Sequence, residues 1–88
     1  MYYLIVYDIT CAKRLVKALK ICRKYLTWIQ NSVFEGELSQ AQFSNLKREL
    51  KNVIDTKKDS VIIFGTQNIK FVDRQVLGVE KNEKSFFI

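Results

Sequence analysis

Asp8 is the residue of this sequence whose type and place most suggest chemistry. It is the only acidic residue before Glu35, and it ends an almost continuously apolar run that begins at Tyr2. The chain contains no histidine, which excludes Ser-His and Cys-His nucleophile pairs and His-ligated metals. Any chemistry must therefore use carboxylates, hydroxyl groups, cations and a metal ion. A structural role for Asp8, as a helix cap or the start of a loop, is the alternative.

Basic residues follow Asp8 at helical spacing. The segment 12–25 carries six positive charges and no negative one, a sum equal to the net charge of +6 of the whole chain. Such a basic face favours an anionic partner, nucleic acid or a membrane surface, because neutralised phosphates release counterions. A solvated charged face is the alternative. The candidate phosphate contacts are Lys13, Arg14, Lys17, Lys20, Arg23 and Lys24.

Length and composition exclude several other classes. Eighty-eight residues make a single domain. Apolar residues make up 48% of the chain, and association of subunits would help to bury them. No apolar run approaches the ~20 residues of a membrane span, and the N-terminus lacks the layout of a signal peptide. We therefore expect a soluble cytoplasmic protein with no membrane partner. Cys11 and Cys22 are too few for a disulfide framework and lack zinc-site spacing, so we expect structural roles for both.

The element that must carry Asp8 is a strand over residues 2–9, whose apolar residues predict burial on both faces in the middle of a sheet. The helix over 12–25 follows it, with apolar residues on one face and the basic residues on another. Strand formers then dominate, but Gln30, Asn31 and Ser32 suit a tight turn. We predict two short strands, 26–29 and 32–37, with a single kinked strand as the alternative.

A second helix and a further strand complete the predicted order. Ser39 and Gln42 have the spacing of a capping box, which predicts a helix start at Ser39. Residues 60–64 form another apolar strand, closed by Gly65. The order is then β-α-β-β-α-β. The predicted buried face of the second helix consists of Phe43, Leu46, Leu50, Val53 and Ile54.

The tail of the chain has no place inside this finished unit. Residues 74–79 form a seventh candidate element, an extra C-terminal strand, and Phe86, Phe87 and Ile88 form a final apolar patch. An extra strand at a sheet edge commonly pairs with another copy of the chain, so we expect the tail to cross to a partner subunit. A strand folded back on its own sheet is the alternative.

Four runs of residues together resemble the CRISPR-associated protein two family. They are residues 6–9 (VYDI), 13–14 (KR), 30–36 (QNSVFEG) and 59–61 (DSV), and the likeness extends over the whole length. The resemblance implies an α+β, ferredoxin-like homodimer, a single domain over 1–88 whose tail from about residue 70 to residue 88 packs on the partner subunit. One departure is that Thr10, Cys11 and Ala12 lie where another acidic residue is often seen, which leaves Asp8 without a near acidic neighbour.

The resemblance also implies roles for individual residues. Asp8 is implied to be the catalytic metal ligand, with one Mg²⁺ per dimer between the two Asp8 side chains, and the reaction is phosphodiester hydrolysis. Lys13 and Arg14 would hold a phosphate beside that metal, with a solvated first helical turn as the alternative. Tyr7 and Phe34 are further candidates, although core packing is the favoured role of both.

Three functions are compatible with these expectations. The first is a scaffold in spacer acquisition, a prokaryotic dimer that binds double-stranded DNA and bridges copies of the CRISPR integrase subunit. The second is a metal-dependent endonuclease acting on DNA or single-stranded RNA, including a stand-alone, toxin-like ribonuclease. The third is a plain RNA-binding module, which we rank last because the sequence lacks the aromatic, glycine-flanked motif of such domains.

Overall fold

The computed structural model describes residues 1–82 of the chain. The predicted β-α-β-β-α-β order is confirmed, and a short 3-10 helix that the sequence did not indicate follows the last strand. The elements are β1 (Tyr2–Asp8), α1 (Ala12–Tyr25), β2 (Thr27–Gln30), β3 (Val33–Glu37), α2 (Gln40–Val53), β4 (Ser60–Thr66) and η1 (Ile69–Phe71).

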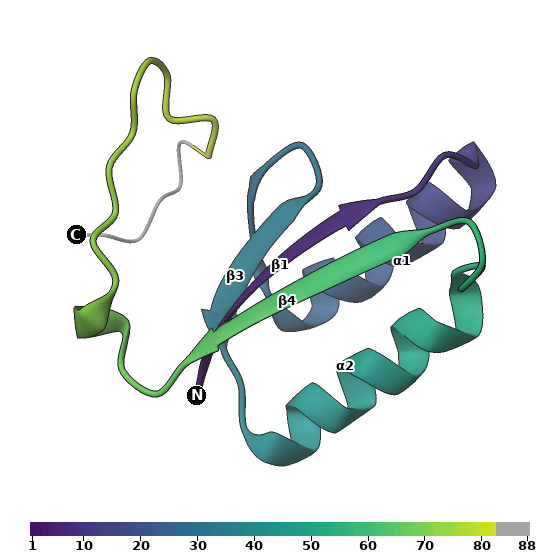
Figure 1. Cartoon of the computed structure of the whole chain (residues 1–88), viewed down its shortest axis with the longest axis horizontal. Helices are drawn as coiled ribbons and strands as arrows, with labels where there is room; N and C mark the ends of the chain where they lie inside the picture. Colours follow the sequence, from purple (N-terminus) through teal and green to yellow (C-terminus); the bar gives the residue numbers. More distant parts are fainter. Residues whose placement is uncertain (83–88) are drawn as a thin grey trace.

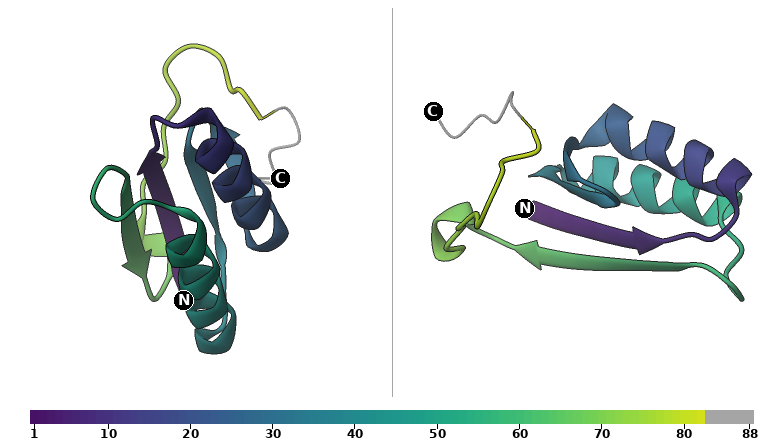
Figure 2. Two further views of the ribbon diagram at one scale, coloured as in Figure 1. Left: turned by 90° about the vertical axis from the view of Figure 1, so that its right-hand side faces the viewer. Right: turned by 90° about the horizontal axis from the view of Figure 1, so that it is seen from above.

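The strands form one sheet in the order β2-β3-β1-β4, and every neighbouring pair is antiparallel. Both helices lie on the same side of this sheet, so the domain has two layers (Figures 1 and 2). The predicted α+β, ferredoxin-like architecture is confirmed. In the described part of the chain, no helix has the length and apolar character to cross a membrane.

The central strand β1 is covered on one face only. Its side chains alternate, and Tyr3, Ile5 and Tyr7 are buried against the helices, whereas Leu4 and Val6 on the other face are half-buried. The prediction that this strand is buried on both faces is therefore wrong for a single chain. The physical reason is that both crossover helices pack on the same side, which leaves the opposite apolar face without a cover.

The turn between β2 and β3 confirms the predicted split of this segment. Asn31 adopts a left-handed conformation with φ of 42°, which asparagine tolerates better than most residues. The indole N–H of Trp28 donates a hydrogen bond of 3.0 Å to the carbonyl of Asn31 and braces the turn. Both strands begin one residue later than predicted.

Strand β4 runs two residues beyond the predicted end, through Gly65 to Thr66. Gly65 pairs with Tyr3 of β1, and a Cβ atom added at Gly65 would lie 3.3 Å from the Tyr3 ring. The glycine therefore allows a close approach inside the sheet and does not terminate the strand.

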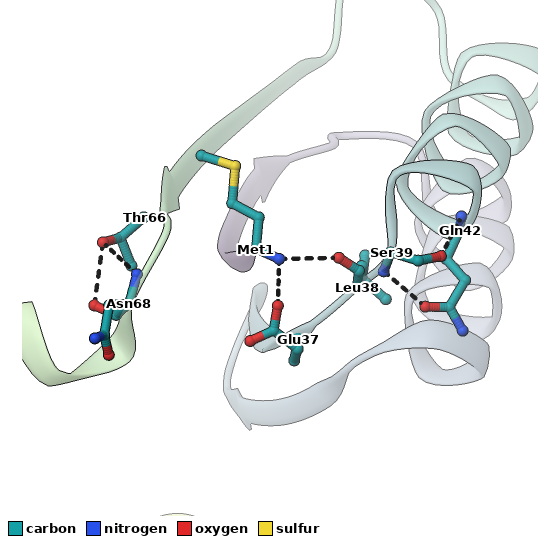
Figure 3. Close-up of polar contacts among 7 residues, drawn as sticks. All are labelled: Met1, Glu37, Leu38, Ser39, Gln42, Thr66 and Asn68. Carbon is teal, nitrogen blue, oxygen red and sulfur yellow. Dashed lines mark hydrogen bonds and ion pairs between the residues drawn. The ribbon is translucent and has the colours of Figure 1, made fainter.

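The start of α2 is fixed by the predicted capping box (Figure 3). The Ser39 hydroxyl accepts from the Gln42 N–H at 3.1 Å, and the Gln42 side chain accepts from the Ser39 N–H at 2.9 Å. The N-terminal amine of Met1 lies beside this cap, paired with Glu37 and 3.2 Å from the Leu38 carbonyl. These contacts tie the beginning of β1 to the connection between β3 and α2.

Replacement of Ser39 by alanine is expected to lower the free energy of unfolding by about 1 kcal/mol, because the backbone N–H of Gln42 loses its hydrogen-bond partner. Urea denaturation at fixed protein concentration measures the change. Ser44→Ala, an exposed position inside the same helix, is the matched control and should change the stability far less. Equal effects of the two substitutions would contradict a capping role for Ser39.

The predicted C-terminal strand is absent from this single chain. Residues 74–79 form no strand, and Leu77 and Val79 are 97% and 70% exposed. After β4 the chain turns through η1 and leaves the sheet at the end where β1 begins (Figure 2). Residues 74–77 then pass near Ile29 and Gln30 of β2 without pairing with that strand. The predicted apolar patch of Phe86, Phe87 and Ile88 lies outside the described residues.

Candidate active site and nucleic-acid interface

Asp8 lies at the C-terminal end of β1, at the end of the sheet away from η1 (Figure 1). It is exposed, it pairs with Ser60 of β4, and strand alternation places it on the same face as Leu4 and Val6. The N-cap position of α1 is Cys11, with no side-chain cap. Asp8 is therefore not the N-cap residue of the following helix.

A single chain offers a metal ion little besides Asp8. No group of three or more His, Cys, Asp or Glu side chains able to hold a metal occurs within residues 1–82. A carboxylate oxygen is nevertheless a ligand that Mg²⁺ prefers, and Mg²⁺ usually keeps several waters beside one or two protein carboxylates. The exposed Asp8 fits such a site when a second copy supplies the second carboxylate.

Arg14 is engaged by an acidic residue far along the sequence. Its Nε and Nη2 atoms donate to the Asp59 carboxylate at 2.7 and 3.0 Å, and the Asp59 side chain is fully buried. The hydrogen bonds from Arg14 hold the pKa of Asp59 below its usual range, and the same pair raises the pKa of Arg14. Arg14 thus binds a carboxylate in this structure, and its contact with phosphate stays a prediction.

The other predicted basic residues lie along the exposed side of α1. Lys24 is paired with Glu49 of α2, which also accepts a hydrogen bond from the Tyr25 hydroxyl. This pairing lowers the pKa of Glu49. The remaining four residues are exposed and form no ion pair with any residue from 1 to 82, and we call them the basic face: Lys13, Lys17, Lys20 and Arg23.

Tyr7 and Phe34 belong to the core. Both are buried, and their rings stack with centroids 6.1 Å apart. They lie on the helix side of the sheet, opposite the face that carries Asp8. Both side chains therefore pack in the core, which is the role that the sequence favoured for them.

The sheet face opposite the helices is apolar, and sequence reasoning did not identify it as a surface. Its side chains are cross-strand neighbours, with Leu4 opposite Phe64 and Val6 opposite Ile62. Ile62 and Phe64 are 51% and 57% exposed. The only sequence signal was that β1 and β4 are apolar at nearly every position. We call this surface the open face: Leu4, Val6, Val33, Ile62 and Phe64.

The tail lies against the same side of the sheet as the open face, because Arg74 contacts Glu35, the cross-strand partner of Leu4. Arg74 lies 3.7 Å from the buried carboxylate of Glu35 and 3.5 Å from that of Glu80. Burial and the adjacent Glu35 raise the pKa of Tyr2. A groove of about 260 Å³ remains between the start of the tail and the sheet, lined in part by Leu4 and Phe64. The tail therefore does not fill the open face.

The two cysteines lie in different environments. Cys22 is fully buried, and burial raises the pKa of its thiol to about 12. Cys11 is half-buried at the start of α1, where the backbone N–H groups of Arg14 and Lys13 lower the pKa of its thiol. The structural role predicted for Cys22 is confirmed.

Comparison with known proteins identifies the family. A family model described as CRISPR associated protein Cas2 matches residues 1–74 of the chain. The chain belongs to the Cas2 family. Two relatives are similar to this Cas2-family chain over nearly its whole length.

One relative, from Thermotoga maritima, is 49% identical over 86 residues, which cover 98% of both chains. Another, from Dictyoglomus turgidum, is 48% identical over 84 residues, covering 96% of this chain and 95% of the relative. Both are named CRISPR-associated endoribonuclease Cas2. The crystal structure of Streptococcus pyogenes Cas2 at pH 6.5 superposes with a TM-score of 0.78 at 33% identity, covering 89% of this chain and all of that one. The likeness therefore extends to the backbone of a solved member of the family.

Proposed function

We propose that this chain works as a homodimer in the cytoplasm of a prokaryotic cell, joined through the open face. The exposed apolar side chains of the open face favour association with a second apolar surface, because their removal from water stabilises the complex. A two-fold axis across the open face brings the same patch of each chain against the other. Strand β4, with seven residues, is an edge strand of the sheet, and the tail of the partner chain, from about residue 70 to residue 88, covers that edge.

In this dimer the two Asp8 side chains approach each other across the two-fold axis. Each Asp8 lies on the same side of the sheet as the open face, and the two carboxylates together would hold a shared Mg²⁺ ion. When bound, the ion would polarise a phosphoryl oxygen and lower the pKa of a bound water. Lys13, in the first turn of α1, and the Nη1 group of Arg14, which takes no part in the two hydrogen bonds to Asp59, position the phosphate of the substrate beside this site.

The basic face is the observation that carries the proposed function. Four exposed cations from one helix, without acidic partners in the described chain, suit the phosphates of a DNA duplex. Contacts to phosphate hold a duplex without recognising its sequence. We propose that the dimer binds double-stranded DNA through two such faces and bridges copies of the CRISPR integrase subunit during spacer acquisition, with Lys24 and Arg14 as additional contacts.

A second candidate function is metal-dependent RNA cleavage. The names of the relatives, CRISPR-associated endoribonuclease, favour it, and single-stranded RNA offers the same phosphodiester to the Asp8 site. Both functions use the same dimer. They differ in whether Asp8 or the basic face is indispensable.

Spacer acquisition in cells that carry the matching CRISPR locus separates the two functions. We expect the Asp8→Ala variant to acquire new spacers at the wild-type rate, because the scaffold needs charge and shape only. A variant with Lys13, Lys17, Lys20 and Arg23 changed to glutamine should acquire almost none. Sequencing of the growing CRISPR array counts the new spacers.

Normal acquisition by the variant with a neutral basic face would show that the scaffold proposal is wrong. Failure of Asp8→Ala, in a protein that still folds and dimerises, would instead move metal-dependent cleavage to first place. Lys47→Gln with Lys51→Gln is the charge control, since both residues are exposed and lie on α2, outside α1 and outside the tail. This control should acquire spacers normally.

A further inference from the structure

Asp59 lies where α1, the segment after α2 and the start of β4 meet, close to the end of β1 that carries Asp8. It directly precedes Ser60, and Ser60 is the residue of β4 that pairs with Asp8. The Asp59 side chain is fully buried, although aspartate is rarely buried unless it is paired.

The Asp59 carboxylate accepts hydrogen bonds from parts of the chain that are distant in sequence. Arg14 of α1 donates two, in the bidentate geometry that fixes direction as well as distance. The backbone N–H of Asp55, after α2, donates to Oδ2 at 2.8 Å.

We infer that Asp59 is a positioning residue for Asp8, acting through Arg14. Asp8 is the last residue of β1, where a strand end is free to fray. Asp59 holds the chain on both sides of this end, because it is adjacent to the cross-strand partner of Asp8 and binds Arg14, in the first turn of the helix that follows Asp8, through two hydrogen bonds. This inference rests on the proposed metal site.

A second ion pair of the same helix provides a matched comparison. Lys24 and Glu49 also join α1 to another part of the chain, but the Lys24 side chain is 57% exposed, and the pair lies near the end of α1 remote from Asp8. Removal of either pair loosens the attachment of α1. Only removal of the Asp59 pair should alter the geometry at Asp8.

The test measures Mn²⁺ affinity by isothermal titration calorimetry on the full-length chain, with thermal melting as the check of folding. We expect Asp59→Asn, which keeps an oxygen acceptor but loses the charge, to weaken Mn²⁺ binding by about tenfold, as loss of a supporting partner does at other metal sites. Arg14→Lys, which keeps the charge but loses the bidentate fork, is the milder second variant and should weaken binding in the same direction. Glu49→Gln should bind Mn²⁺ like the wild type.

Amide hydrogen exchange of the metal-free protein gives an independent measurement. Exchange at residues 9–14 should accelerate in Asp59→Asn and not in Glu49→Gln. Wild-type Mn²⁺ affinity in a folded Asp59→Asn, or in Arg14→Lys if the first variant does not fold, would overturn the inference and leave the metal site standing. If the wild-type chain itself binds no Mn²⁺, the proposed metal site is wrong and the positioning role falls with it.

Discussion

Replacement of Phe64 by glutamate is expected to convert the dimer into a monomer. Phe64 lies on the open face, opposite Leu4, and is 57% exposed in the single chain. Dimerisation through this face would bury two new carboxylates without partners, at a cost of several kcal/mol for each. The dissociation constant should therefore rise by roughly 10³-fold or more. Sedimentation equilibrium over a range of protein concentrations measures it.

Val16→Glu is the matched control for this substitution. Val16 is also an exposed apolar residue, 47% exposed, but it lies on α1, on the other side of the sheet. A carboxylate there stays in water, so the dimer should persist. A Phe64→Glu variant that remains dimeric would mean that the chains associate through another surface, and the shared Asp8 site would lose its basis.

Neutralisation of Lys17 and Lys20 is expected to weaken duplex binding at least about 10²-fold at physiological salt, because each lost phosphate contact removes a released counterion. A dimer carries four of these lysines. The slope of log K against log salt should accordingly fall in magnitude by about 4. Fluorescence anisotropy with a labelled duplex at several salt concentrations gives both quantities.

The same loss should appear with two duplexes of unrelated sequence, because phosphate contacts do not distinguish bases. Lys47→Gln with Lys51→Gln removes an equal charge from exposed positions on α2, outside α1 and outside the tail, and should leave the slope close to that of the wild type. If both double variants change the slope equally, binding depends on net charge, and the basic face is not the interface.

Local sequence patterns predicted most of the fold. The bounds of α1 were correct because its apolar and basic residues repeat at helical spacing, and the split between β2 and β3 followed from the turn residues around Asn31. The end of β4 was misplaced because Gly65 looks like a terminator in sequence. Its role is to accommodate the ring of Tyr3, and that neighbour is brought beside it only by strand pairing.

The candidate site was predicted less completely, for a physical reason. The position of Asp8 at the end of a central strand was predicted from the apolar run that precedes it. The partner of Arg14 could not be predicted, because Asp59 lies 45 residues away and is brought close only by the packing of α1 against α2, the helix that precedes Asp59. The open face was missed because an apolar strand pattern does not distinguish cover by a helix from cover by another chain.

The difference between the two thiols allows the wild-type chain to be labelled at Cys11 and not at Cys22. Only the thiolate reacts with maleimide reagents, so the buried Cys22 is inert, whereas Cys11 has a lowered pKa and partial exposure. A spin label or fluorophore on Cys11 would lie three residues from Asp8 without any substitution in the protein. In a dimer the two labels form a symmetric pair, and the distance between them reports how far apart the two ends of β1 are held in solution.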